Sequence, residues 1–226
     1  MSRTARATDT TRQRGEATRQ LLLEEATRQF AETGFNGTSL AAIAAACGLG
    51  NAGVLHHFPS KQRLYKAVLT RISEWLAEDV EAVLAGHATP EERLRAMIRR
   101  NVTGIVAHPG AERLILRELM DNAGRLGQAR SLPLLPFVAT FCELIEDAQR
   151  ADAAPPGPAV VLLTQFLGTL SYALVVRPTF ARMKLGTDLL ENERRWIEAI
   201  GKTAERTLLL DRPDHSQPSR HHRRAS

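Results

Sequence analysis

The sequence of 226 residues is poor in cysteine and contains no long uninterrupted apolar run. Its two cysteines, Cys47 and Cys142, are too few and too far apart for a disulfide framework, so we expect both thiols to be reduced and buried. No run approaches the roughly 18 apolar residues that a membrane helix needs, which predicts a protein without a membrane partner. Residues 1–20 lack the apolar core of a secretory signal, so we expect a cytoplasmic protein.

Neither sign of charge dominates the chain. It has 30 Lys and Arg residues against 25 Asp and Glu residues, a formal net charge of +5 that is too small to indicate a nucleic-acid partner alone. The excess is concentrated at both ends, in residues 1–13 and 211–226, which we expect to be disordered basic segments. Whether either segment contacts a partner stays open.

Strand-forming patterns are almost absent, and the abundance of Ala, Leu, Arg and Glu favours helix. Apolar residues at helical spacing, ended by glycine or proline, predict an all-α fold of about nine helices. We expect three short helices in a head of residues 14–60, and a larger helical bundle in residues 61–210. The expected helices are 14–33, 39–47, 51–57, 61–85, 90–106, 111–123, 134–151, 159–176 (ended by Pro178) and 188–210.

Residues 39–58 have the pattern of a helix-turn-helix motif. Ile43 and Val54 anchor two short helices, and Gly48 permits the left-handed turn between them. The glycines at 48 and 50 therefore need no phosphate-binding role, and no strand precedes them as a dinucleotide-binding loop requires. His56 and His57 are adjacent, so their side chains diverge by roughly 100° on a helix. With no carboxylate or cysteine at ligand spacing nearby, we predict no metal site and no cofactor.

Many spaced positions in residues 19–68 agree with one known family. The chain resembles the TetR family of transcriptional regulators there, and less specifically at His108-Pro109 and Arg117-Glu118-Leu119. Two positions depart from the family pattern: Gly50, where Ser is frequent, and Leu55, where Tyr is usual. The matching residues are Leu22-Leu23, Phe30, Gly34-Phe35, Thr38-Ser39-Leu40, Ile43-Ala44, Gly48-Leu49, Leu55-His56-His57-Phe58-Pro59-Ser60-Lys61 and Leu64.

The resemblance implies a ligand-responsive repressor that binds a palindromic DNA operator as a homodimer. We expect Gly50 to cap the recognition helix and Asn51, Ala52, Gly53 and His56 to face base edges. The phosphate contacts expected are Thr38, Ser39, His57 and Lys61. The arginines before residue 19 either add DNA contacts or remain free of DNA.

The resemblance also implies a ligand-sensing part, roughly residues 61–150, with a small-molecule effector of unknown identity. Met and aromatic side chains suit adaptable apolar pockets, although at helical spacing they also form ordinary core. The candidate pocket residues are Trp75, Met97, Asn101, Thr103, Met120, Phe137, Phe141, Gln165 and Tyr172.

The expected helices 159–176 and 188–210 are the predicted homodimer interface, because the first is apolar all round. The alternative is that both helices bury against the chain's own sensor helices. The predicted interface residues are Leu163, Phe166, Leu167, Leu170, Leu174, Trp196, Ile200 and Leu208.

Two other functional classes compete with a ligand-responsive regulator. One is a dimeric helical interaction protein without an effector. The other is an enzyme, for which acids such as Glu118, Asp121 and Glu143 are available. No nucleophile, base and orienting group can be assembled from their spacing, so we predict no catalytic residues.

Overall fold

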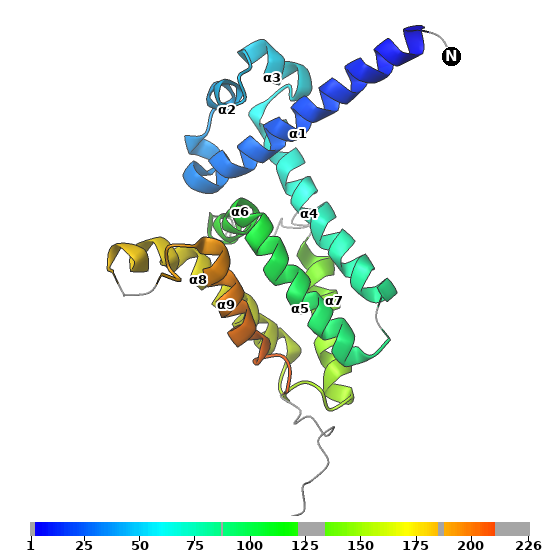
Figure 1. The fold of residues 1–226 in the computed structure, drawn as a ribbon, viewed down its shortest axis with the longest axis vertical. Coiled ribbons are helices and arrows are strands. Elements are labelled where there is room, and N and C mark those ends of the chain that lie inside the picture. The colour runs from blue at the N-terminus through cyan, green and yellow to red at the C-terminus, as the bar shows by residue number, and fades with distance from the viewer. Residues whose placement is uncertain (1–2, 87, 122–133, 185–187, 211–226) are drawn as a thin grey trace, which may run out of the picture.

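The computed structural model describes residues 3–86, 88–121, 134–184 and 188–210, and contains no strand among them. The prediction of an all-α fold is confirmed (Figure 1). The helices are α1 (Arg3–Gly37), α2 (Leu40–Ala46), α3 (Asn51–His57), α4 (Lys61–Gly86), α5 (Pro90–Ala107), α6 (Pro109–Asp121), α7 (Leu134–Arg150), α8 (Ala159–Arg182) and α9 (Glu193–Glu205).

Helix α1 begins about ten residues earlier than the apolar pattern predicts. The expectation of a disordered segment over residues 1–13 is therefore wrong from Arg3 onward. These residues lack the apolar stripe that marks a packed helix, yet no Gly or Pro among them interrupts the helix. At the other end, Gly34 has φ +74° and bends the chain there, as predicted for a glycine stop. Residues 211–226 lie outside the described part of the chain.

Two separate groups of buried side chains divide the molecule into a head and a helical bundle, named the sensor domain after its expected role. The head core joins α1, α2 and α3 to the first three turns of α4, through Leu64, Val68 and Ile72. The sensor core begins farther along α4, at Val83, and continues through α5, α7, α8 and α9. The predicted boundary at residue 60 is thus displaced into α4, which belongs to both parts.

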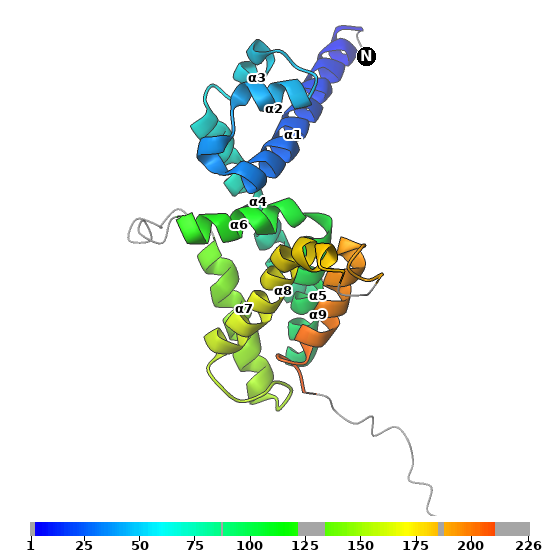
Figure 2. The ribbon, with the colours of Figure 1, turned by 90° about the vertical axis from the view of Figure 1, so that its left-hand side faces the viewer.

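Helix α6 lies between the head and the sensor bundle (Figure 2). Its Ala111 and Leu114 are buried in the head core. The guanidinium of Arg117 donates hydrogen bonds to the carbonyls of Ala31 (3.3 Å) and Glu32 (3.2 Å), beside the Gly34 bend. The head is therefore attached to the rest of the molecule at two places: through α4, which runs through both parts, and through these contacts with α6.

Helix α8 continues to Arg182, so the prediction that Pro178 ends it is wrong. Arg177, the residue before the proline, donates to the Leu190 carbonyl (2.9 Å) and to Glu193 (3.0 Å), which ties this part of α8 to the start of α9. Helix α9 starts at Glu193 rather than near residue 188, because the Asn192 side chain accepts from the Arg195 amide (3.0 Å) and caps it.

By length and composition, α8 is also the one helix in the described residues that could span a membrane. It meets this criterion as a core helix does, since its inner face, including Phe166 and Leu170, is fully buried by neighbouring helices. Its outer face remains exposed.

Candidate DNA-binding head, sensor cavity and dimer face

The predicted helix-turn-helix is present, with α2 and α3 meeting at an angle of 105°. The hydroxyl of Ser39 accepts from the Ala42 amide (3.1 Å) and caps α2. Gly48 then adopts φ +68°, and the next amide, of Leu49, donates back to Ala44 (2.8 Å). This closes the turn and fixes the direction in which α3 leaves it.

One side of α3 anchors it in the head, and the other is exposed. Val54 is fully buried, whereas Asn51, Ala52 and His56 are exposed, as expected for residues that face DNA. Gly53 differs from the expectation, because it is half-buried and packs against Leu49. The exposed face also includes Leu55, which is 40% exposed. Because Leu55 follows Asn51 by four residues, helical spacing places both on one face, so the sequence could have indicated that Leu55 is exposed.

Two of the expected phosphate contacts have structural roles instead. The Thr38 side chain is 4% exposed, and its hydroxyl donates to the Gly34 carbonyl (2.9 Å). The Lys61 ammonium donates to the carbonyls of Phe35 (2.9 Å) and Thr38 (3.0 Å) and lies over the Phe35 ring. Both side chains thus hold the corner between α1 and α2, so we no longer assign them to phosphates. Ser39 is exposed and His57 half-exposed, which leaves both available to DNA.

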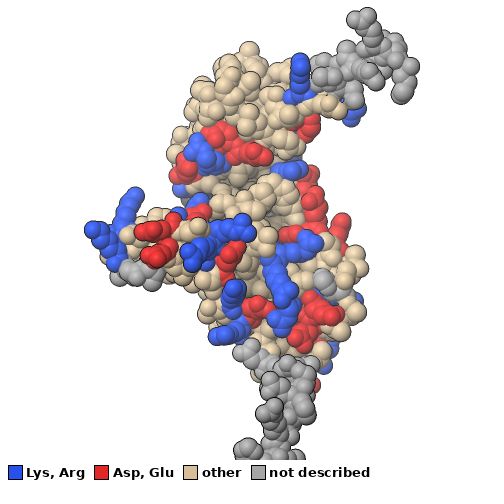
Figure 3. Space-filling view, viewed as in Figure 1, with Lys and Arg blue, Asp and Glu red and all other residues tan. Residues whose placement is uncertain are grey.

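Residues 38–60 contain no charged side chain, so the positive charge of the head comes from flanking helices. Arg19 of α1 and Arg63, Lys66 and Arg71 of α4 line one shallow groove. The Arg19 guanidinium lies 5.3 Å from the centre of the Phe58 ring, which places this groove next to the end of α3. These cations were missed by the helix-turn-helix pattern, which covers only the uncharged segment. The upper surface of the head is correspondingly almost free of charge in the view of Figure 3.

Replacing either turn glycine by serine tests the conformation of the turn. Gly48→Ser forces a side chain into the left-handed region and should lower the free energy of unfolding by about 1–2 kcal/mol. Gly50→Ser is the matched control, because Gly50 has φ −77° at the start of α3 and no side-chain cap. It should raise the free energy of unfolding by a few tenths of a kcal/mol. Urea unfolding followed by circular dichroism measures both, and equal effects would contradict the assigned turn.

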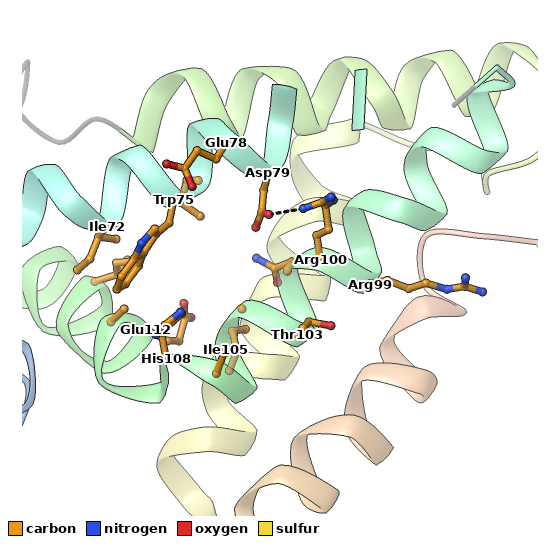
Figure 4. Close-up of a pocket in the computed structure, with 16 residues that line it drawn as sticks. Ile72, Trp75, Glu78, Asp79, Arg99, Arg100, Thr103, Ile105, His108 and Glu112 are labelled. Atoms are coloured by element: carbon orange, nitrogen blue, oxygen red, sulfur yellow. Dashed lines mark hydrogen bonds and ion pairs between the residues drawn. The ribbon is translucent and has the colours of Figure 1, made fainter. Parts of the chain in front are cut away.

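A cavity of about 530 Å³ lies between α4, α5 and α6 (Figure 4). Of the candidate pocket residues, Trp75, Asn101 and Thr103 line it. Met97, Phe137 and Phe141 are instead buried in the sensor core, which is the alternative that their spacing allowed. Met120 is exposed on α6, and Gln165 and Tyr172 are exposed on the outer face of α8.

A carboxyl group that the sequence did not single out lines this cavity. Glu112 of α6 accepts a hydrogen bond from the Ser171 hydroxyl of α8. Its side chain keeps some surface on the cavity, yet burial of the carboxyl raises its pKa above the ordinary value of 4.5. Among the described residues, the effect that opposes this shift is the Ser171 hydrogen bond rather than a cation. Asn101 of α5 lines the same cavity, and its Oδ1 atom is buried without a hydrogen-bond partner in the described part of the chain.

Glu112 should make stability depend on pH. Because burial raises the pKa of Glu112 in the folded state, its carboxyl ionises more readily in the unfolded chain. Glu112 therefore destabilises the fold progressively as pH rises above about 4.5. Glu112→Gln should therefore raise the melting temperature more at pH 7.5 than at pH 4. Glu78→Gln is the matched control, since Glu78 is exposed on the same cavity. If the melting temperatures of Glu112→Gln and wild type differ by the same amount at both pH values, Glu112 does not cause the pH dependence.

The predicted dimer residues divide between the interior and the surface. Leu163, Phe166, Leu170, Leu174 and Leu208 are buried within the chain, so assigning them to the interface was wrong. The helix is apolar all round because its inner face forms the sensor core. Leu167, Trp196 and Ile200 are only partly buried.

The exposed face of α8 is nevertheless unusually apolar. No charged residue occurs between positions 159 and 176. Val161, Tyr172 and Val175 are 48%, 65% and 57% exposed on this face. A shallow depression of about 590 Å³ runs along it to Trp196 and Ile200 of α9, and Gly168 is among the residues that line it. This face, rather than the buried leucines, is the candidate interface.

In the part of the chain that the structure describes, no cluster of three or more His, Cys, Asp or Glu residues could hold a metal ion. His56 and His57 stack edge to face, with ring centres 5.3 Å apart. Cys47 and Cys142 are free thiols, and burial raises the pKa of each.

Comparison with known proteins agrees with this architecture. Residues 22–68, which span most of the head, match the model of bacterial regulatory proteins of the tetR family. The chain is 34% identical over 159 residues to the HTH-type transcriptional regulator RutR of Escherichia coli, covering 70% of this chain and 74% of RutR. It is 31% identical over 119 residues to the HTH-type transcriptional repressor KstR2 of Mycolicibacterium smegmatis, covering 53% and 55% of the two chains.

Solved structures share the fold at lower identity. The ketosteroid transcriptional regulator KstR2 of Mycobacterium tuberculosis has a TM-score of 0.59 at 20% identity, with 82% of this chain and 93% of KstR2 covered. AibR, in complex with isovaleryl coenzyme A and operator DNA, has a TM-score of 0.55 at 21% identity, with 82% and 97% covered.

Proposed function

The chain belongs to the tetR family of bacterial regulatory proteins and is a DNA-binding transcriptional regulator, and from this premise we propose that it is a ligand-responsive repressor acting as a homodimer on a palindromic operator. Members of this family bind operator DNA, dimerise and respond to small molecules. The observation that carries the proposal is α3, a helix anchored by Val54 whose exposed face has no partner within the described chain. We also propose a cytoplasmic location.

On DNA, α3 would enter the major groove. Asn51 can hydrogen-bond to both edge groups of an adenine, and Ala52 and Leu55 are suited to the methyl group of thymine. His56 and Gly53 border this surface. Because few side chains here donate hydrogen bonds, the shape of the operator would contribute to specificity.

The DNA backbone would be held mainly by the flanking cations. Ser39 caps α2 and His57 ends α3, and Arg19, Arg63 and Lys66 provide the charge that residues 38–60 lack. Each phosphate that such a side chain neutralises releases counterions and makes binding more dependent on salt.

Arg63 provides a direct test of whether these flanking cations bind the DNA phosphates. Arg63→Gln should weaken binding to specific and random duplexes alike, and reduce the slope of log affinity against log salt by about 1. Arg206→Gln, which removes an exposed arginine at the end of α9, is the control. Fluorescence anisotropy at several salt concentrations measures the slope. An unchanged slope for Arg63→Gln would remove Arg63 from the phosphate contacts.

The homodimer would form by pairing the exposed faces of α8, with the adjoining edges of α9, about a two-fold axis. Such an isologous helical interface buries apolar surface from both copies and is the commonest way to close a homodimer. It would also set the distance between the two α3 helices, and hence the spacing of the operator half-sites.

Helix α6 is the proposed link between cavity and head. It carries Glu112 into the cavity and, little more than one turn later, Arg117 onto the end of α1. A ligand that favours one position of α6 would therefore change the position of the head. The ligand acts on DNA affinity only if it binds the two positions with different strength.

The intergenic DNA next to the protein's own gene is the first test. We expect a fragment that contains an inverted repeat to bind the purified protein at nanomolar concentration, in the range typical of specific complexes. Equal affinity for that fragment and for random DNA would contradict the proposed repressor.

A further inference from the structure

Two oxygen acceptors that line the cavity, the Glu112 carboxyl and the Asn101 Oδ1 atom, have few hydrogen-bond donors. The Glu112 carboxyl accepts one hydrogen bond, from the neutral hydroxyl of Ser171, and no cation within the described ranges stabilises it. The Asn101 Oδ1 atom accepts none. Burying a carboxyl or amide oxygen without its full set of donors is costly, so such a group in a native protein requires an explanation, and a bound molecule that donates hydrogen bonds provides one.

The charges around the cavity favour a positively charged occupant. Arg100 is paired with Asp79 at 2.9 Å, and Arg99 extends away from the other labelled side chains in Figure 4. Neither cation is directed at Glu112. The Glu112 carboxyl thus has no opposing cation among the described residues. An anionic effector, such as a coenzyme A thioester, would meet the unopposed Glu112 carboxyl in this cavity.

The other residues that line the cavity indicate which kind of molecule would fit beside Glu112 and Asn101. Ile72, Leu76, Ile105 and Ile115 are apolar, and the rings of Trp75 and His108 stack at 4.1 Å to form a flat end wall. The volume of about 530 Å³ suits a small organic molecule.

We propose that the effector is a small organic cation: a protonated amine or amidine that donates N–H hydrogen bonds to Glu112 and Asn101, with an apolar body along the walls. This inference rests on the proposed function, since it names the ligand class of the same cavity. A hydrogen bond between charged groups is worth more than a neutral one, so the positive charge provides the selectivity.

Three probes with one body and different head groups separate the possibilities: 4-phenylbutylamine, 4-phenylbutan-1-ol and 4-phenylbutanoate. Calorimetric titration of the full chain at pH 7.5 should give the amine a dissociation constant at least about tenfold below that of the alcohol. The carboxylate should bind most weakly. Glu112→Gln should remove the preference for the amine, and Glu78→Gln, at the exposed rim, should preserve it.

Several results would overturn the inference: equal or tighter binding of the alcohol or carboxylate, a preference that survives Glu112→Gln, or no binding of any probe at millimolar concentration. The same probes added to a complex with operator DNA keep the two proposals apart. If the amine binds but the DNA is retained, the proposed ligand response fails and the cation site stands. If the carboxylate binds most tightly and releases the DNA, the ligand response stands and the cation site fails.

Discussion

The double variant Gly168→Glu/Tyr172→Glu is expected to be monomeric, and its affinity for a two-half-site operator should fall at least about a hundredfold. Both residues are exposed on the outer face of α8, in a stretch without any charged side chain. A pair of symmetric helices would place four carboxylates in one apolar interface, and unpaired buried charge is strongly unfavourable. Operator affinity falls because two linked heads bind far more tightly than one.

This variant is designed to leave the monomer intact. A side chain at Gly168 meets no atom within 4 Å, and Tyr172 is 65% exposed. Leu170→Glu would be a poor test, because Leu170 is fully buried in the sensor core. Leu84→Glu is the matched control, since Leu84 is 50% exposed near the end of α4, away from the candidate interface. Light scattering that finds wild type monomeric at micromolar concentration, or the double variant dimeric, would contradict the proposed interface.

A carboxylate on the recognition helix should have an effect of similar size. Ala52→Glu would place a negative charge in the major groove between two rows of phosphates, where like charges are separated by a short distance. We expect at least about a hundredfold loss of operator affinity, equivalent to about 2.7 kcal/mol. Ala77→Glu on the exposed side of α4 is the control. Both changes lie on exposed helix surface, so the unfolding temperature should hardly change.

Anisotropy titrations with the same operator duplex measure this loss. Retained affinity in Ala52→Glu would show that α3 does not face the groove, even if the protein binds DNA by another surface. A matching loss in Ala77→Glu would indicate a general effect of added negative charge.

The bounds of short helices and the positions of turns could be predicted because they are set by residues that are adjacent in the sequence. Helix α3 has the predicted bounds, since Gly50 and Pro59 delimit it from both sides. The turn at Gly48 follows from one residue that tolerates positive φ. By contrast, Pro178 does not end α8, where the neighbouring Arg177 is bonded to Leu190 and Glu193, residues that lie beyond the end of the helix.

The sites that the sequence misassigned depend on tertiary structure. An apolar helix does not reveal which of its faces lies inside, so buried Leu170 was placed in the dimer interface. Lys61 looks like a phosphate ligand until the folded corner supplies two carbonyls for its ammonium. Glu112 and Asn101 are separated by a helix break, and only the packing of α4, α5 and α6 brings them to one cavity.

Selection of duplexes bound by the wild-type protein from a random pool tests the central claim, that a dimer of this chain reads DNA with α3. The bound sequences should converge on an inverted repeat whose half-sites are centred about one helical turn, or a multiple of it, apart. Convergence on a single unrepeated site, or no enrichment over the starting pool, would contradict that claim.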